Sequence, residues 1–295
     1  MSAHDPGKIE KFREQLRHEW TSEETVAAWK KWHARLADFT GGVTRLLLEA
    51  AQLRPGMNVL DLASGVGDPV LSEAVAVAPD GHVTATDLNP AMLAFIEEQA
   101  RQRKITNINF REASAEALPF PEASFDALTC RFGIMFFPDL NKSLRECLRV
   151  LKPKSRATFV AWGRREQPFF ACTGGILMKH IELPKPDPEA PNIAMFGEPN
   201  RMRTALESAG FAEAREEMRT MEGRWRGSVD EYWEQFSEVA APFRVILEKL
   251  GSESKSRAIN EIKSALRKFQ RGSEVVMPLE IVIGSGVRGS GKARP

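Results

Sequence analysis

The sequence predicts an α/β protein built on a doubly wound, mostly parallel sheet, and three patterns support that fold class. A short apolar run at residues 57–62 is typical of a buried strand, and it is followed by a turn of small residues and an apolar-periodic helix. A second strand, residues 82–87, ends on an acid and is again followed by a helix. Strand-and-helix units continue to residue 162, an alternation that favours a parallel sheet covered on both faces.

The N-terminal part of the chain is predicted to be helical after a loose tail of residues 1–7. Residues 8–53 carry a helical pattern, which we expect in three pieces separated near residues 21–22 and 40–42. The second break is predicted because two glycines follow Thr40 directly. Ser22 is a suitable N-cap for the middle piece.

Tryptophans gather on one face of the middle helix. Trp29, Trp32 and Leu36 recur at helical spacing. In one interpretation they only pack the helix onto the domain. In the other, the helix is a lid over a ligand, and Trp29, Trp32 or His33 lines the active site.

The turn after the first strand is the most informative stretch. Its small residues allow a sharp bend and a close approach of a ligand; they are Ala63, Ser64, Gly65 and Gly67. Asp68 and Pro69 then predict an N-cap and a first helical position. Free amides at such a helix start can receive anionic or polar ligand groups.

The acid at the end of the second strand predicts a ribose contact. Asp87 lies 20 residues after Gly67, the distance at which one βαβ unit delivers a carboxylate to the two hydroxyls of a bound nucleoside. The alternative is an ordinary turn acid at a strand end. The spacing from the glycine turn favours the ribose role. Asn89 and Pro90 then start the next helix.

Further strands and helices are expected in a regular order up to residue 162 and less regularly beyond it. Loop 114–120 should reach the base of a bound nucleoside, because ligands of open α/β sheets sit outside the carboxyl ends of the strands. Asp139 or Asn141 caps a helix that Lys152–Lys154 stops. The other expected elements are strands at 107–113, 125–130, 157–162, 211–221 and 279–283, a wall at 131–137, a crossing loop at 163–197, a helix at 198–209 and a broken helical region at 229–270.

Composition excludes several classes of protein and partner. The net charge of +1, from 41 basic and 40 acidic residues, gives no electrostatic reason to expect nucleic acid. The three cysteines follow no metal or disulfide spacing, and the five histidines do not cluster with acids, so no metal is predicted. With neither an apolar span nor a signal peptide in the pattern, we expect a cytoplasmic protein without an integral membrane segment, as a monomer or a homodimer.

Four motifs in order resemble the class I S-adenosylmethionine-dependent methyltransferases, in particular the ubiquinone/menaquinone-biosynthesis C-methyltransferase-like (type 11) small-molecule branch. The motifs are Val59–Pro69, Thr86–Leu93, Ala113–Phe120 and Phe125–Leu151. The resemblance implies a Rossmann-like sheet of seven strands with the last strand antiparallel. We expect one structural domain with an N-terminal helical lid (1–53), a cofactor-binding core (54–162) and a completion of the sheet with acceptor-side helical insertions (163–295).

The resemblance also implies which residues contact S-adenosylmethionine. The turn from Asp61 through Ala63, Ser64, Gly65 and Gly67 would hold the methionine part, and Asp87 would take the ribose hydroxyls. The remaining implied contacts are Leu88 and Met92 at the adenine, Ser114, Ala115 and Glu116 at its edge, and Arg131 and Phe132 near the transferred methyl group. Two positions depart from the family pattern: Ala63 replaces a glycine, and Ser114 replaces the acid at the adenine edge.

The implied activity is methyl transfer to a small acceptor by in-line displacement, which depends mainly on holding donor and acceptor together. Aromatic residues in the lid and insertions indicate a hydrophobic or aromatic acceptor, methylated on carbon or oxygen. The alternative is that these segments only cover the edges of the sheet. If a base is needed, His33 and His180 are candidates. One alternative is a protein that binds the cofactor without methyl transfer. A nicotinamide-dependent oxidoreductase is remote, because Val70 occupies the position of the third glycine in its motif.

Overall fold

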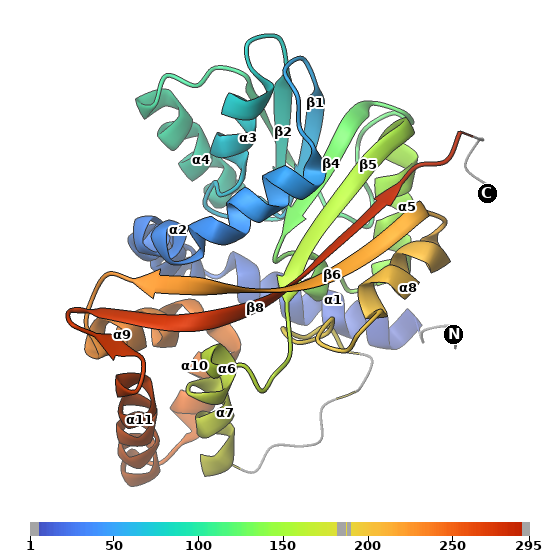
Figure 1. The fold of residues 1–295 in the computed structure, drawn as a ribbon. Helices are drawn as coiled ribbons and strands as arrows, with labels where there is room; N and C mark the ends of the chain where they lie inside the picture. The colour runs from blue at the N-terminus through green and yellow to red at the C-terminus, as the bar shows by residue number, and fades with distance from the viewer. Residues whose placement is uncertain (1–5, 182–186, 188–189, 291–295) are drawn as a thin grey trace.

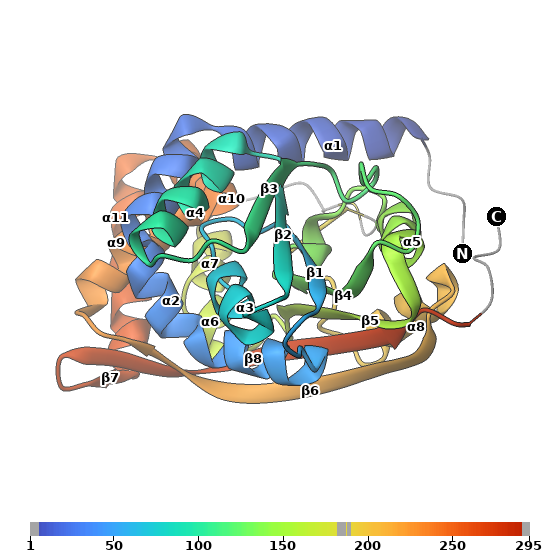
Figure 2. The same ribbon diagram turned by 90° about the horizontal axis from the view of Figure 1, so that it is seen from above.

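One sheet runs through the computed structural model, which describes residues 6–181, 187 and 190–290. Figure 1 shows its strands flanked by helices, and Figure 2 shows the same layers from above. The strands are β1 (Asn58–Leu62), β2 (His82–Asp87), β3 (Ile108–Glu112), β4 (Phe125–Arg131), β5 (Leu151–Trp162), β6 (Ala212–Trp225), β7 (Gln270–Arg271) and β8 (Glu274–Val287). The helices are α1 (Pro6–Thr21), α2 (Glu23–Ala51), α3 (Val70–Val77), α4 (Pro90–Gln102), α5 (Leu140–Val150), α6 (Pro168–Ala171), α7 (Gly174–Leu177), α8 (Arg201–Ala209), α9 (Val229–Val239), α10 (Ala241–Lys249) and α11 (Ser252–Arg267), with 3-10 turns η1 (Ile134–Phe136) and η2 (Met178–His180).

The strand order confirms the doubly wound fold. The strands lie in the order β3-β2-β1-β4-β5-β8-β6, and the two-residue β7 pairs with β8. Strands β1 to β5 are parallel, whereas β8 is antiparallel to both β5 and β6. The chain winds from β1 outward to β3 and then returns to place β4 on the other side of β1. This reversal opens a crevice at the carboxyl ends of β1 and β4, where ligands of such sheets bind.

The helices pack on both faces of the sheet. Helices α3 and α4 lie against β1, β2 and β3, and α2 crosses β4, β5, β6 and β8. Helices α5 and α8 pack against each other and against the other face of the sheet. The buried residues under α3 and α4 form a small core of their own, and those under α2, α5 and α8 form the large one. Both cores support β1 and β4, so the ends of these strands are held rigidly.

Strands β6 and β8 extend beyond β5 as a long antiparallel pair. Pairing of β5 with β8 stops at Ile281, while β6 continues to pair with β8 as far as Val275. Helices α6, α7, α9, α10 and α11 gather around this extension (Figure 1). The sequence predicted a strand that ends at Met221, but β6 continues to Trp225, and exposed Glu222 and Arg224 alternate there with buried Gly223 and Trp225. None of the helices in the described part of the chain is long and apolar enough to cross a membrane.

The predicted break at Thr40–Gly42 is wrong. Helix α2 is continuous from Glu23 to Ala51, with Ser22 as its N-cap. Tertiary packing explains the glycine: a Cβ on Gly42 would lie 2.4 Å from Cε of Met221 in β6. The helix therefore approaches the sheet at a residue without a side chain, and packing outweighs the low helix propensity of glycine.

Two further boundaries differ from the prediction. Asp68 does not cap α3, whose first residue is Val70 and which has no side-chain cap. The Asp68 carboxylate instead accepts a hydrogen bond from the Thr44 hydroxyl and forms an ion pair with Arg131. Helix α5 ends at Val150, before Lys152–Lys154, but strand β5 begins at Leu151 rather than at Ala157, so Pro153 lies inside the strand. The register shift between β4 and β5 and the left-handed Lys154 accommodate the proline there.

We predict opposite effects for the two neighbouring glycines of α2. Gly41→Ala should raise the free energy of unfolding by about 0.5–1 kcal/mol, because no atom lies within 4 Å of its Cβ position and alanine favours helix. Gly42→Leu should lower it by about 1–3 kcal/mol through overpacking against Met221. Urea unfolding followed by circular dichroism checks both, and equal effects of the two changes would contradict this packing.

Candidate functional site

A strained turn follows β1 at the carboxyl end of the sheet. Ala63, Gly65 and Gly67 have φ values of 54°, 53° and 104°, all in the left-handed region. Gly133 leaves room for the unusual alanine, since a Cβ there would lie 2.6 Å from Cβ of Ala63. A Cβ on Gly65 would meet no atom within 4 Å, so this backbone borders open space. A small polar ligand can therefore approach the turn closely.

Ser64 holds the turn between β1 and β2. Its hydroxyl donates to Oδ1 of Asp61 at 2.7 Å and accepts from the Thr86 amide at 3.1 Å. The Ser64 amide donates to the carbonyl of Thr86 at 2.9 Å. Asp61 is fully buried and also accepts from Thr129 at 3.2 Å. Burial raises the pKa of Asp61 to about 7, against the opposing effect of the Ser64 and Thr129 hydroxyls.

Asp87 joins the glycine turn to the end of β2 through backbone amides. Its Oδ2 accepts from the Gly65 amide and its Oδ1 from the Asn89 amide, both at 2.9 Å. Burial raises the pKa of Asp87, and these backbone amides act in the opposite direction. Each oxygen keeps a second lone pair, so the carboxylate can still accept from a diol.

The loop after β3 is tied to the N-terminal helix. The Glu116 carboxylate accepts from Nε of Arg13 at 2.8 Å and from the Asp139 amide at 3.0 Å, while Oγ of Ser114 accepts from the Glu116 amide at 3.2 Å. The predicted adenine-edge residue Glu116 is thus already paired within the protein. Met92 is buried, whereas Leu88 and Ala115 are partly exposed.

Arg131 and Phe132 end β4 beside the turn. Arg131 forms an ion pair with Asp68 at 3.2 Å and donates to Oγ1 of Thr40. Phe132 has a φ of 61° and stacks on Trp162 with a centroid distance of 4.2 Å and an interplanar angle of 14°. The left-handed backbone at Phe132 turns its ring onto the end of β5.

Helices α1 and α2 make a polar contact with the loop after each of the four strands β1 to β4. Four bonds do this: Thr44 to Asp68 (2.6 Å), Asn89 to the Trp20 carbonyl (3.1 Å), Arg13 to Glu116 (2.8 Å) and Arg131 to Thr40. Arg13, Thr40 and Thr44 were not predicted as site residues. The i, i+4 spacing of Thr40 and Thr44 on one face of α2 could have indicated the two threonines, whereas no sequence pattern marks Arg13.

The two tryptophans of the predicted lid helix, Trp29 and Trp32, contact different parts of the protein. Trp29 packs on Trp20, and Trp20 packs on Phe136 beside the end of β4. Trp32 instead donates to Oε2 of Glu238 at 2.6 Å and packs on Trp225. Trp29 is therefore the tryptophan of this helix that lies on the strand-end side.

The two histidines that were candidate bases are held by other contacts. The ring of His33 packs edge-on against Phe95 of α4, and its Nδ1 lies 2.8 Å from the Lys30 carbonyl. His180 lies in η2, with Nε2 2.9 Å from Glu261 of α11. None of these contacts joins the ring of His33 or of His180 to Asp87.

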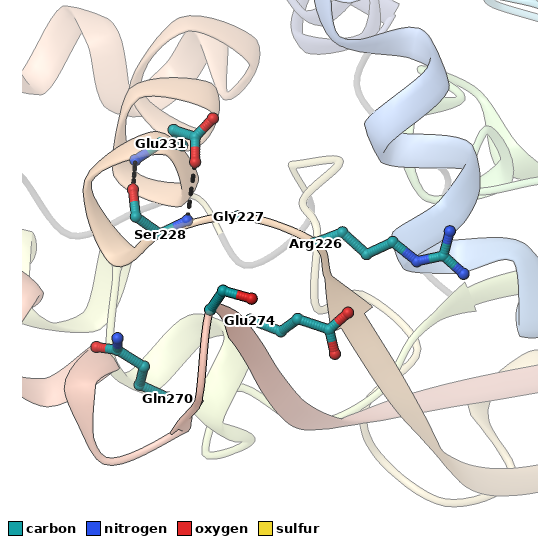
Figure 3. A pocket seen from close by; sticks show the side chains of 7 residues that line it. Arg226, Gly227, Ser228, Glu231, Gln270 and Glu274 are labelled. Carbon is teal, nitrogen blue, oxygen red and sulfur yellow. Dashed lines mark hydrogen bonds between the residues drawn. The ribbon is translucent and has the colours of Figure 1, made fainter.

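A surface hollow lies away from this crevice, between the start of α9 and the β7–β8 turn (Figure 3). Ser228 and Glu231 line it and form a capping box, in which each side chain bonds the other residue's amide. Because these polar groups are satisfied by helix capping, we place no site there.

We predict that a bound cofactor changes the fluorescence of Trp29 and not of Trp32. S-adenosylhomocysteine should quench or shift the emission of Trp32→Phe as strongly as that of the unmodified protein, because Trp32 faces α9. Trp29→Phe should lose a large part of the signal. A full signal in Trp29→Phe would count against a lid role for this face.

Comparison with known proteins agrees with this geometry. Residues 42–183 match the model of the ubiE/COQ5 methyltransferase family. The "Ubiquinone/menaquinone biosynthesis C-methyltransferase UbiE" of Shewanella sediminis is 34% identical over 180 residues, covering 57% of this chain and 72% of the relative. The protein of the same name from Serratia proteamaculans is 34% identical over 178 residues, covering 57% and 71%.

Solved structures share the fold. The YcgJ protein of Bacillus subtilis superimposes with a TM-score of 0.57 at 21% identity, over 85% of this chain and 100% of that one. A putative methyltransferase from Bacillus halodurans gives 0.58 at 20% identity, over 84% and 99%. The motifs, the strand order and the curated relatives agree: the chain belongs to the ubiE/COQ5 methyltransferase family and is an S-adenosylmethionine-dependent methyltransferase.

Proposed function

We propose that the enzyme transfers the methyl group to carbon or oxygen of a small aromatic or hydrophobic acceptor. The observation that carries this proposal is a ladder of stacked rings that leads away from the end of β4. Phe132 stacks on Trp162, and Trp162 stacks on Phe169 of α6 with a centroid distance of 4.5 Å and an angle of 21°. The Arg131 guanidinium lies over the Phe132 ring, 5.1 Å from its centroid, so a flat apolar acceptor would pack beside Trp162 and Phe169.

The residues at the strand ends fit S-adenosylmethionine. Asp87 offers free lone pairs to the ribose, and the turn at Gly65 borders open space. Two buried donors, Nε of Arg131 at the end of β4 and Nε1 of Trp29 on α2, have no hydrogen-bond partner among the described residues. Such donors suit a carboxylate, which the methionine part of the cofactor carries.

Each group of predicted contact residues has a role in this proposal. Asp61, Ala63, Ser64, Gly65 and Gly67 would hold the methionine part. The other groups are Leu88, Met92, Ser114, Ala115 and Glu116 around the adenine, and Arg131 and Phe132 near the sulfonium. The bound cofactor supplies an electrophilic methyl group, and the protein supplies orientation and exclusion of water.

The walls beyond the ladder are aromatic and poor in charge. Phe169 packs on Phe39 of α2 and Phe236 of α9, and the Tyr232 hydroxyl lies 3.7 Å from Sδ of Met277. Burial raises the pKa of Tyr232, so it does not serve as a base near neutral pH. An apolar acceptor loses little hydration in such surroundings, whereas a charged one would lose much.

The curated relatives favour carbon methylation of a quinone precursor, because their name describes a C-methyltransferase of ubiquinone and menaquinone biosynthesis. The family match ends at residue 183, however, and α9, α10 and α11 lie beyond it. We infer that residues 1–53 act as the lid, 54–162 as the cofactor core and 163–295 as the acceptor side of one domain. We therefore assign the acceptor to a chemical class, aromatic or hydrophobic small molecules, and not to one named compound.

The direct test of this function is an acceptor panel. Hydroquinones, naphthols and other phenols, together with polar amines as controls, are incubated with S-adenosylmethionine and followed by mass spectrometry. We expect methylation within the aromatic group. Tight cofactor binding without turnover on any acceptor would favour a protein that binds the cofactor for another purpose.

Asp87→Ala should weaken S-adenosylmethionine binding by about 1.5–3 kcal/mol, the scale for hydrogen bonds to a charged group. Isothermal calorimetry checks this. Glu112→Ala is the matched control, because Glu112 pairs in register with Asp87 on β3 but is exposed. Unchanged affinity in folded Asp87→Ala would refute the ribose role.

Phe169→Ala should raise the KM for an aromatic acceptor by roughly two- to twelvefold, since a stacked pair contributes about 0.5–1.5 kcal/mol beyond its buried area. The Kd for S-adenosylmethionine should stay within about twofold of the unmodified enzyme. Phe120→Ala is the control, because Phe120 packs on Phe125 and not on the ladder. An equal rise in both variants would show a general loss of packing instead.

A further inference from the structure

Glu73 is a buried acid that the proposed methyl transfer does not use. It lies on α3, whose other buried residues are apolar, and its side chain is fully inaccessible. No donor group among the described residues hydrogen-bonds to either carboxyl oxygen. An ionised carboxylate is very unfavourable in such a place, so the group must be neutral or must share its charge.

The register of the sheet shows what Glu73 faces. Val59 pairs with Ala127, and both pack in the small core with α3. Asp61 and Thr129 are the next residues on the same face, and they pair with each other. Helix α3 therefore covers the Asp61–Thr129 pair, and Glu73 is the polar residue of α3 that is buried above it.

The charged surroundings of Glu73 are mostly acidic. Burial and then the charge of Asp61 raise the pKa of Glu73, Asp68 adds to this, and the nearby Thr129 hydroxyl opposes it. Asp68 is itself compensated by Arg131 from β4 and by Thr44 from α2. Asp87 acts on Asp61 from the end of β2. These carboxyl groups cannot all ionise beneath one turn.

We propose that Glu73 is a positioning residue that stays protonated and donates its hydroxyl to Asp61. Asp61 is then the anion that receives the ammonium group of S-adenosylmethionine at the glycine turn. This proposal rests on the proposed placement of the methionine part at residues 61–67. The proton remains on Glu73 throughout, and any proton on Asp61 passes to the solvent when the cofactor binds.

If Glu73 acts as a neutral donor, glutamine should replace it without loss of function and methionine should not. Glu73→Gln keeps a neutral donor of the same length, whereas Glu73→Met fills the space without a donor. In Glu73→Met, Asp61 keeps the Ser64 and Thr129 donors but loses the third one, so desolvation favours its protonated form more strongly.

The binding test compares two ligands in three proteins at pH 8. S-adenosylmethionine carries the amino-acid part, and 5′-methylthioadenosine has the same nucleoside and sulfur without it. In Glu73→Gln both Kd values should stay within about twofold. In Glu73→Met the Kd for S-adenosylmethionine should rise about tenfold, the loss expected for a hydrogen bond to a charged group, with that for 5′-methylthioadenosine unchanged.

Two results would overturn the proposal. Equal weakening in both variants would mean that Glu73 must ionise, and equal weakening of both ligands in Glu73→Met would mean a purely structural role. Failure of the wild-type protein to bind S-adenosylmethionine would instead contradict the proposed function, and the ligand-free measurements below would still decide the state of Glu73.

The ligand-free protein offers an independent readout. Infrared spectroscopy at pH 8 should show a protonated carboxyl band that disappears in Glu73→Gln. The free energy of unfolding of the wild type should fall as the pH rises above about 4.3, because the unfolded chain releases a proton that the folded one keeps. Glu73→Gln should fall less steeply. The absence of the band, or equal slopes, would contradict a protonated Glu73.

Discussion

Two side chains hold the ends of β1 and β2 together, and the rest of the site depends on that junction. Asp87 accepts from the amides of Gly65 and Asn89, and Ser64 bonds both Asp61 and the Thr86 amide. These bonds keep three left-handed residues in one short turn, a backbone that would otherwise relax. The core under α3 and α4 and the strand order around β1 bring the two strand ends to the same place.

The N-terminal helices contact the carboxyl ends of β1, β2, β3 and β4 or the loops that follow them. Each of the four polar contacts joins a residue of α1 or α2 to a loop that carries a sequence motif. Opening the crevice requires these contacts to break, and exposed partners such as Arg13 contribute less than the shielded Arg131. The same helix α2 supplies Phe39 to the aromatic cluster, so the proposed donor and acceptor sides share one covering helix.

The sequence was sufficient for the fold class and for the positions of the glycine turn and of Asp87 at adjacent strand ends. These features lie within neighbouring βαβ units: the periodicity of the strands, the glycine turn and the acid at Asp87. Local sequence patterns describe such units well. Contacts between distant segments could not be predicted. The continuity of α2 depends on the approach of Met221 to Gly42, the partners of Asp68 come from α2 and β4, and the buried position of Glu73 emerges only when α3 is laid over Asp61 and Thr129.

The placement of the cofactor across the tips of β1 and β2 is the claim on which the acceptor side and the role of Glu73 both depend. A crystal structure with S-adenosylhomocysteine tests it most directly. We predict both ribose hydroxyls within hydrogen-bond distance of the Asp87 carboxylate and the amino-acid end over Gly65. A nucleoside bound elsewhere, with Asp87 contacting only the backbone of its own turn, would contradict the account.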